Sequence, residues 1–310
     1  MANRTLPSLC CFVALLPSLS QAALYITIVQ GLGGQPEYDS EFTESREKIE
    51  AASHSMTAAE NISSFNGESA SRENLLKHFA DITARMNEDD RAAIYLVGHG
   101  SFDGETYKFN IPGPDLSDTD LKNILENFPG QNHFLVNTSS TSGAMLESIV
   151  GEGEEASNPD YIIVSATRNG NERNSTHFGR FFADALTNEE ADLNKNSTVS
   201  IEEAFDFATR SVESYFEEAG RLSTEHAQLR GDGAAQFSLS RLSEIQIESE
   251  NPVINDLLQQ RLALDAEIEN LQLRRNQMSN AEYIQQLQAL VLRSAELSER
   301  IENQQGSAAP

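Results

Sequence analysis

Two short polar loops follow apolar segments of the sequence and contain the side chains best suited to chemistry. The apolar segment Arg91–Val97 is followed by His99 between two glycines, and the segment His133–Val136 is followed by a turn of small hydroxyl residues that includes Ser140. A histidine in such a loop can act as a general base on a ligand that approaches the backbone closely. The backbone N–H groups of a serine-rich turn before a helix can stabilise an oxyanion. By residue type alone, such a turn is more often a helix cap than a nucleophile.

Apolar segments rich in β-branched residues predict the strands that position these loops. They lie at Ala23–Gln30, Arg91–Val97, His133–Val136 and Tyr161–Ser165. Helical spacing of apolar residues predicts helices at about 41–52, from 72 onward, and at about 117–128, 178–186 and 200–219. Strands that alternate with helices predict a mainly parallel sheet covered on both faces, with ligand-binding loops at the carboxyl ends of the strands. His99 and Ser140 are therefore expected at one edge of one sheet.

The combination of the two loops resembles the caspase/legumain-like superfamily of cysteine peptidases, of the C13 type, and is most similar to its exported bacterial members. The resemblance covers about residues 23–233. In the family, one strand ends in Gly-His-Gly, as at 98–100 here, and the next core strand ends in a turn of the type Ala-Cys-x-Ser-Gly. Residues 139–143, Ser-Ser-Thr-Ser-Gly, match that turn with Ser140 in the place of cysteine. The segments Tyr107–Gly113 and Thr224–Leu229 also resemble the bacterial members.

The resemblance implies an α/β fold, a caspase-like three-layer sandwich, and a role for each loop residue. His99 would be the general base and Ser140 would stand at the position of the nucleophile. The backbone N–H groups of Gly100 and Ser140 would bind the oxyanion. Ser139 is the fallback nucleophile if the correspondence shifts by one residue.

A third segment lies where the family has a substrate-contacting loop. Arg168 and Glu172 follow the strand predicted at 161–165 and are the candidates for substrate binding there. We favour the alternative for this pair, an exposed ion pair without a binding role. His226 lies in a second family-like segment and is the one other histidine that we single out; the remaining histidines show no spacing typical of metal ligands.

The serine at position 140 leaves three functional hypotheses open. A cysteine peptidase depends on a readily ionised thiol, whereas a serine nucleophile needs a base that a third group already orients. We favour a catalytically impaired relative that binds peptide or protein, so enzyme activity stays uncertain. The first alternative is an active serine-type endopeptidase or acyl hydrolase that uses Ser140 and His99. The second is an envelope interaction protein that acts through a helical hairpin at the C-terminal end.

Residues 1–22 have the pattern of a secretory signal peptide. Arg4 precedes an apolar stretch at 6–19, and Ser20-Gln21-Ala22 offers small residues at the −3 and −1 positions of a cleavage site. We expect cleavage after Ala22 and export to the periplasm or exterior of a bacterial cell. Both cysteines, Cys10 and Cys11, would leave with this segment, so the mature chain would have no thiol nucleophile. No later segment is long enough to predict a transmembrane helix.

Acidic residues dominate the sequence and include a loop that could bind a cation. The formal net charge is −26, which argues against a nucleic-acid partner because phosphate binding needs clustered Lys and Arg. The loop at 192–203 follows the ligand plan of an EF-hand, although Ser197 occupies the usual glycine position. We expect at most weak Ca²⁺ binding, with a dissociation constant of about 10⁻⁴–10⁻³ M, and no required cofactor. The same residues also form a helix capping box, which is compatible with metal binding. The expected ligands are Asp192, Asn194, Asn196, Thr198, Ser200 and Glu203.

The C-terminal part differs in composition from the segment at 23–245 and predicts a separate unit. Residues 252–303 are rich in Leu, Gln, Glu and Arg, and Ser279-Asn280 interrupts their helical pattern. We expect an antiparallel helical hairpin of the coiled-coil type, followed by a disordered tail at 304–310. The hairpin is expected to pack on the preceding domain; the alternative is an oligomer or partner interface. Its apolar stripes consist of Ile254, Leu257, Leu264, Ile268 and Leu271 in the first helix, and Tyr283, Leu287, Leu290, Val291, Leu297 and Ile301 in the second.

Overall fold

A six-stranded sheet forms the centre of the molecule. The computed structural model describes residues 22–151, 161–242 and 251–306. Neighbouring strands of the sheet are parallel except for β10, which pairs antiparallel with β8 at one edge. The sheet therefore has the mainly parallel arrangement that the alternation of strands and helices predicts. Its strands, in spatial order, are β10 (Gln228–Arg230), β8 (Tyr161–Ser165), β7 (His133–Asn137), β3 (Arg91–Val97), β1 (Leu24–Gln30) and β2 (Ile62–Phe65).

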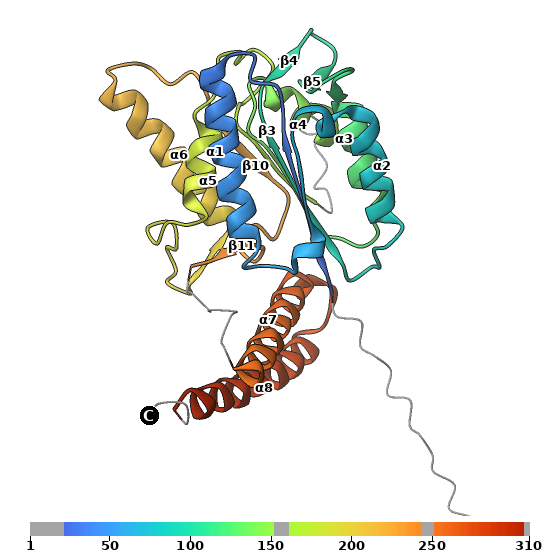
Figure 1. The fold of residues 1–310 in the computed structure, drawn as a ribbon, viewed down its shortest axis with the longest axis vertical. Coiled ribbons are helices and arrows are strands. Elements are labelled where there is room, and N and C mark those ends of the chain that lie inside the picture. Colours follow the sequence, from blue (N-terminus) through green and yellow to red (C-terminus); the bar gives the residue numbers. More distant parts are fainter. Residues whose placement is uncertain (1–21, 152–160, 243–250, 307–310) are drawn as a thin grey trace, which may run out of the picture.

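Helices cover both faces of this sheet, as Figure 1 shows. One face packs against α1 (Pro36–Ser53), α5 (Phe178–Ala185) and α6 (Ile201–Glu218). The other face packs against α2 (Arg72–Thr83), α3 (Asp118–Asn127) and α4 (Ser142–Val150). Strand β3 is buried throughout, and its alternate residues enter the two separate cores, as the two-residue period of a strand requires. The predicted three-layer α/β fold is confirmed.

Short elements complete the domain at its periphery. A three-stranded antiparallel sheet joins β4 (Gly100–Phe102), β5 (Tyr107–Phe109) and β6 (Leu116–Ser117). A second small sheet pairs β9 (Thr198–Ser200) with β11 (Ser238–Arg241). Single 3₁₀ turns lie at Ala59–Asn61, Gly67–Ala70 and Arg275–Gln277.

The C-terminal hairpin is present and lies against the end of the sheet where the strands begin (Figure 1). It consists of α7 (Pro252–Leu273) and α8 (Asn280–Gly306). Arg261 Nη1 donates to Ser298 Oγ at 2.7 Å, and Arg293 pairs with Glu267 at 2.8 Å. These pairings run in opposite directions along the two helices, which confirms the antiparallel arrangement.

Two details of the hairpin correct the sequence prediction. Val291 was expected in the apolar seam, but its side chain is 51% exposed, whereas Leu297 and Ile301 are buried against α7. The predicted tail also begins too early, because α8 continues to Gly306; residues 307–310 lie outside the described part of the chain. Helix α8 extends further because the polar residues before Gly306 are compatible with helix, and polarity alone does not end one.

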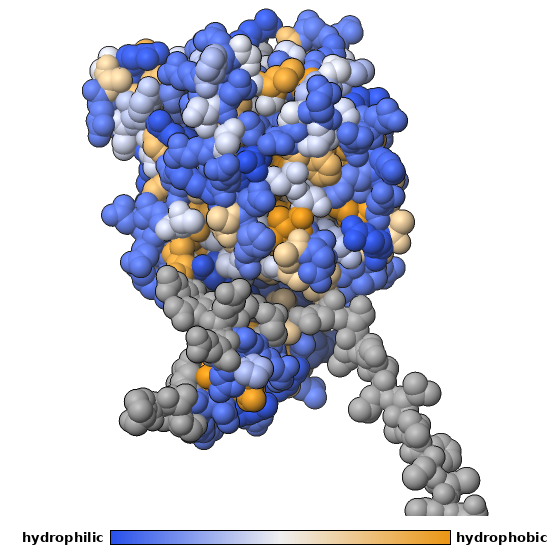
Figure 2. All heavy atoms as spheres, in the orientation of Figure 1, coloured by the Kyte–Doolittle hydropathy of each residue, from blue (hydrophilic) through white to orange (hydrophobic). Residues whose placement is uncertain are grey.

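The sequence placed the long elements well and missed the short or polar ones. Helix α1 begins at Pro36 rather than near residue 41, since proline is favourable in the first turn and Glu37 and Asp39 suit the helix N-terminus. Strand β2 was missed because Ile62–Phe65 contains two serines and shows no buried pattern. Within the three described ranges, no helix is long and apolar enough to cross a membrane. In Figure 2, the visible face is largely hydrophilic, and its hydrophobic patches are small and separate.

Candidate active site

The loops that contain His99 and Ser140 meet at the carboxyl edge of the sheet. Strands β3 and β7 are parallel neighbours, with Leu96 paired to Asn137, so the loops that follow them emerge side by side. Ser140 Oγ donates to the carbonyl oxygen of Gly100 at 3.0 Å, and the backbone N–H of Gly100 donates to Ser140 Oγ at 3.4 Å. A Cβ atom on Gly100 would lie 2.5 Å from Ser139 Oγ and from the Ser140 carbonyl oxygen. Glycine is therefore what allows this close approach.

His99 lies near Ser140 in the fold but is held by other groups. Its half-buried ring makes edge contacts with Tyr38 and Phe42 of α1, at centroid distances of 4.7 and 5.0 Å. Burial lowers the pKa of His99, while a hydrogen bond with the Gly33 backbone and the nearby Asp39 carboxylate oppose this shift. A bond that favours the charged ring has the ring as donor, so the acceptor is the Gly33 carbonyl oxygen.

The hydrogen bonds of His99 differ from those of a serine-type triad. Asp39 Oδ1 accepts from the Gly33 backbone N–H at 2.9 Å, so this carboxylate orients the loop that holds the ring rather than the ring itself. Among the hydrogen bonds of the described residues, none joins His99 to Ser140 or to a carboxylate. Neither Ser140 nor the ring is thus arranged for direct proton transfer between them.

Ser139, the fallback nucleophile, is inaccessible. It is fully buried, and its Oγ lies 2.7 Å from the Tyr107 hydroxyl and donates to the Ser140 carbonyl oxygen at 3.1 Å. Asn137 Nδ2 donates to the same Tyr107 hydroxyl at 2.8 Å. Burial raises the pKa of Tyr107, so this network stays neutral. Ser139 therefore supports the Ser140 turn from behind, and a reacting role for it does not fit the structure.

A strained residue separates Ser140 from α4. Thr141 adopts the left-handed region with φ of 58°, which is unusual for a β-branched side chain. Its backbone N–H donates to the Glu172 carbonyl oxygen at 2.9 Å, while its Oγ1 is buried without a hydrogen-bond partner. Such strain costs about 1–3 kcal/mol and persists where the surroundings enforce it. The turn is thus fixed from the side of the Arg168–Glu172 loop.

The structure brings Arg168, Glu172 and His226 into one cluster beside this turn. Glu172 Oε1 lies 3.3 Å from Arg168 Nη2 and 2.6 Å from His226 Nδ1, and Glu172 Oε2 accepts the backbone N–H of both residues. Burial raises the pKa of Glu172, but its hydrogen bonds with Arg168 and His226 outweigh that effect and lower it overall. The Arg168 side chain is 60% exposed. The pair is thus an ion pair, as the alternative expected, and it also borders the Ser140 turn.

A buried carboxylate near this cluster was not singled out from the sequence. Glu225 is 4% exposed and accepts the backbone N–H groups of His177 and Phe178 at the start of α5. Burial raises the pKa of Glu225 to about 7, against these hydrogen bonds. Its position next to His226 in a family-like segment was the available signal, but burial of a glutamate has no mark in the local sequence.

The predicted calcium loop adopts a compact turn in which the expected ligands are already hydrogen bonded. Asp192 accepts the backbone N–H groups of Asn196 and Ser197 at 3.1 and 2.9 Å. Ser197 takes a positive φ of 65°, the conformation for which an EF-hand uses glycine. Glu203 Oε1 accepts from Leu193 and Asn194, and Glu203 Oε2 accepts the N–H and Oγ–H of Ser200. The predicted capping box is therefore formed, and Glu203 would exchange some of these bonds on binding a cation.

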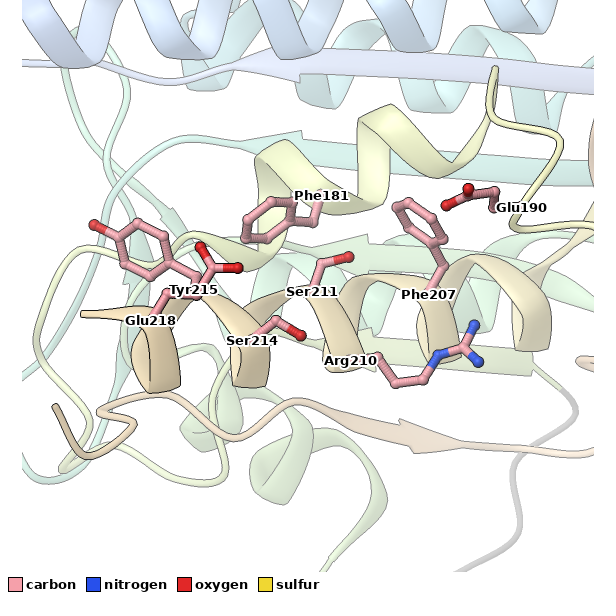
Figure 3. Close-up of a pocket in the computed structure, with 8 residues that line it drawn as sticks. All are labelled: Phe181, Glu190, Phe207, Arg210, Ser211, Ser214, Tyr215 and Glu218. Carbon is pink, nitrogen blue, oxygen red and sulfur yellow. The ribbon is translucent and has the colours of Figure 1, made fainter. Parts of the chain in front are cut away.

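An open cavity of about 470 Å³ lies away from the two loops, between α5 and α6. Figure 3 shows Phe181 and Phe207 on the two helices with Ser211 between them and Arg210 at the outer side. None of the residues that line this cavity was expected to act in catalysis or binding. The loops at the carboxyl edge remain the candidate site.

Comparisons with known proteins find similarity in structure but not in sequence. No family model matches the sequence, and no curated protein matches it. A structural-genomics protein from Geobacter sulfurreducens is similar in structure, with a TM-score of 0.46 and 11% identity, over 71% of this chain and 97% of that one. Caspase-1 from Spodoptera frugiperda is similar with a TM-score of 0.41 and 11% identity, over 68% of this chain and 87% of that one. These likenesses concern the fold, and membership of the caspase/legumain-like superfamily stays a proposal.

Proposed function

We propose that the chain is an exported, catalytically impaired relative of the caspase/legumain-like peptidases that binds peptide or protein. The carrying observation is the hydrogen bond of Ser140 Oγ to the Gly100 carbonyl oxygen at 3.0 Å. This bond uses the proton that a general base would have to remove. His99 in turn bonds to the Gly33 backbone, and among the described residues no carboxylate forms a hydrogen bond with its ring.

The chemistry of serine supports this proposal. A thiol next to a histidine can ionise on its own, so a Cys–His dyad works without an acid. A hydroxyl requires a base whose positive charge a third group stabilises as it forms. Burial lowers the pKa of His99 and opposes that charge. In this proposal, the loops at the carboxyl edge of the sheet bind peptide, but Ser140 is not activated as a nucleophile.

The Arg168–Glu172 loop is the binding element in this proposal. Glu172 fixes the loop beside the Ser140 turn. The exposed Arg168 guanidinium contacts Glu172 through Nη2, and its other N–H groups can pair with an acidic side chain of a bound peptide. Arg173, an exposed residue of the same segment, offers a matched control. We expect Arg168→Ala to weaken binding to a peptide library about tenfold, as the loss of one charge-assisted contact does, and Arg173→Ala to leave it unchanged.

A cleavage assay on the same peptide library tests the catalytic part. We expect no cleavage above background from the unaltered chain, and the same background level from Ser140→Ala. Cleavage that disappears in both Ser140→Ala and His99→Ala would contradict the proposal and favour the serine-type hydrolase. Ser140→Cys supplies the thiol of the family, and cleavage gained on that change would mean that the remaining machinery is intact.

The loop at 192–203 supports a secondary proposal. We infer weak Ca²⁺ binding at the 192–203 loop, since Asp192 and the side-chain oxygens of Asn194 and Asn196 line one turn. Thermal unfolding in 0–10 mM CaCl₂ is expected to show a rise in melting temperature of a few degrees that Asp192→Ala removes, for a dissociation constant of about 10⁻³ M. No rise with the unaltered chain would exclude the site.

Exposed apolar side chains on α8 favour the hairpin as a second interaction surface. Ile284, Val291 and Leu292 are 44%, 51% and 65% exposed. In this proposal the chain associates with a second copy or another protein through α8. Sedimentation of the unaltered chain and of Leu292→Glu tests association with a second copy: one monomeric mass for both would contradict self-association.

A further inference from the structure

The main-chain nitrogen of Ala23 donates a hydrogen bond to a buried carboxylate. The distance from this nitrogen to Asp90 Oδ1 is 2.7 Å, and Asp90 is 2% exposed. Asp90 Oδ2 accepts from the backbone N–H and from Nδ2 of Asn87, both at 2.9 Å. The donors to this carboxylate from the described residues are all neutral amides. Within the described ranges, no Lys, Arg or His side chain forms an ion pair with Asp90.

Two arginines that line the same cavity as Ala23 have other partners. Arg91 pairs with Glu269 at 2.6 Å, and both side chains are buried. Arg241 pairs with Asp265 at 2.6 Å. A buried carboxylate is stabilised further when a positive charge pairs with it, and the described side chains supply no such partner for Asp90.

We propose that cleavage after Ala22 supplies this partner, as the α-ammonium group of Ala23. Hydrolysis adds one water to the Ala22–Ala23 peptide bond: the Ala22 carbonyl carbon takes the hydroxyl, and the Ala23 nitrogen takes the proton. At neutral pH the new amine binds a further proton, since its ordinary pKa is about 8. The nitrogen that donated as a neutral amide becomes a cation at the same carboxylate. The inference rests on the proposed export, which predicts this cleavage position.

The structure holds Ala23 in place independently of the preceding residues. The Ala23 carbonyl oxygen accepts the backbone N–H of Arg91 at 2.8 Å, and β1 begins at the next residue. Loss of residues 1–22 therefore leaves the Ala23 nitrogen anchored beside Asp90. A cavity of about 810 Å³, lined in part by Ala22, Ala23 and Asp256, adjoins this nitrogen. It gives water access to the two ammonium protons that do not point at Asp90.

The pairing is specific to one cleavage position. A chain that begins at Ala22 has its ammonium about 3.8 Å further along the backbone and keeps a neutral amide at Ala23. A chain that begins at Leu24 lacks the donor. A chain that begins at Ala23 should therefore be more stable than a chain that begins at Ala22 or at Leu24.

Thermal unfolding of chains that begin at Ala23 tests the ion pair. The free-amine chain is compared with the same chain acetylated at its N-terminus, which removes the charge and changes no side chain. We expect the free amine to melt about 5 °C higher, as a charge-assisted hydrogen bond in a chain of this size allows. In Asp90→Asn the two forms are expected to melt together. Equal melting temperatures with Asp90 intact would overturn the proposal.

Two further measurements keep the result interpretable. If Asp90→Asn does not fold, the chain that begins at Ala22 replaces it: it has a free amine one residue away and is expected to melt like the acetylated form. A melting temperature equal to that of the free Ala23 chain would overturn the proposal. N-terminal sequencing of the protein recovered from the exporting cell tests the processing separately, so failure of export and failure of the ion pair are distinguishable. Ala23 is expected as the first residue, and any other residue would overturn the inference.

Discussion

The two edges of the central sheet hold their buried polar groups in different ways. At the carboxyl edge, Ser140 is fixed by neutral hydrogen bonds to the Gly100 backbone. At the amino edge, Arg91 and Glu269 form a buried ion pair that attaches α7 to the domain. A neutral hydroxyl can be deleted cheaply, whereas removal of one buried charge leaves the other uncompensated. Removal of one member of the amino-edge pair should therefore cost more stability than removal of the Ser140 hydroxyl.

Two histidines at opposite edges of the sheet also differ in their hydrogen bonds. His133 at the start of β7 accepts the Ala92 N–H at Nδ1 and lies 3.0 Å from the Pro129 carbonyl oxygen at Nε2, so both ring nitrogens have partners. His99 at the opposite edge is half-buried and bonds to the Gly33 backbone. Burial lowers the pKa of both. The ring of His133 is thus bonded at both nitrogens, whereas the partners described for the His99 ring are the Gly33 backbone and the aromatic rings of α1.

The largest effect is expected from the amino-edge ion pair. Glu269→Gln leaves the Arg91 guanidinium buried without a counterion, and we expect the free energy of unfolding in urea to fall by about 3–5 kcal/mol. The exposed pair Arg293–Glu267 provides the control, and Glu267→Gln should cost about 0–1 kcal/mol. Similar losses for the two variants would contradict a larger contribution from the buried amino-edge pair. The double variant Arg91→Met with Glu269→Leu is expected to recover most of the loss.

Acid should destabilise the fold through His133. Burial lowers the pKa of His133 to about 4, whereas the unfolded value is about 6.5. The unfolded chain therefore binds the proton first as pH falls, so this contribution to stability is complete above pH 6.5 and is lost between pH 6.5 and pH 4. The loss from this residue is about 3 kcal/mol.

The pH dependence of the unfolding free energy checks this expectation. His133→Gln should be less stable at pH 7 and should show a smaller decline between pH 6.5 and pH 4 than the unaltered chain. Parallel curves for the two proteins would mean that His133 is not the group that titrates. His99→Gln is the matched comparison at the other edge, where the half-exposed ring should contribute less.

A smaller loss is expected from the contact between the two loops. Gly100→Ala places a methyl group 2.5 Å from Ser139 Oγ, so the loops must separate, at a cost of about 1–3 kcal/mol. The neighbouring Ser101 is exposed, and Ser101→Ala should change stability by less than about 0.5 kcal/mol. Urea unfolding measures both. An unchanged midpoint for Gly100→Ala would contradict the close approach of the loops.

Much of the fold was predictable because its strands are buried on both faces. Strands β3 and β8 were placed at their observed bounds, since continuous apolar segments have few other stable arrangements. The polar strand β2 and the edge strand β10 were not predicted, because pairing with a neighbour rather than composition defines them. The position of Val291 in α8 was wrong for a related reason: which face of a helix is covered depends on the crossing of the two helices.

The candidate site shows the same division. The sequence identified His99 and Ser140 and placed them at one sheet edge, because parallel strands bring their carboxyl ends together. It could not show that Ser140 bonds to the Gly100 backbone, that Tyr38 and Phe42 pack on His99, or that Ser139 is buried. These contacts join segments that are far apart in the chain, and local patterns do not encode them.

The sequence by itself determined the layered α/β architecture, the hairpin, the residues available for chemistry and the expected removal of both cysteines. Periodicity and residue type are local properties, so they can be read without coordinates. Only the tertiary structure decided which polar groups meet: the neutral bond that holds Ser140, the paired charges Arg91 and Glu269, and the approach of the Ala23 nitrogen to Asp90. The physical reason is that burial and partner choice arise from packing between distant segments, and these two factors set the cost of every polar group in the fold.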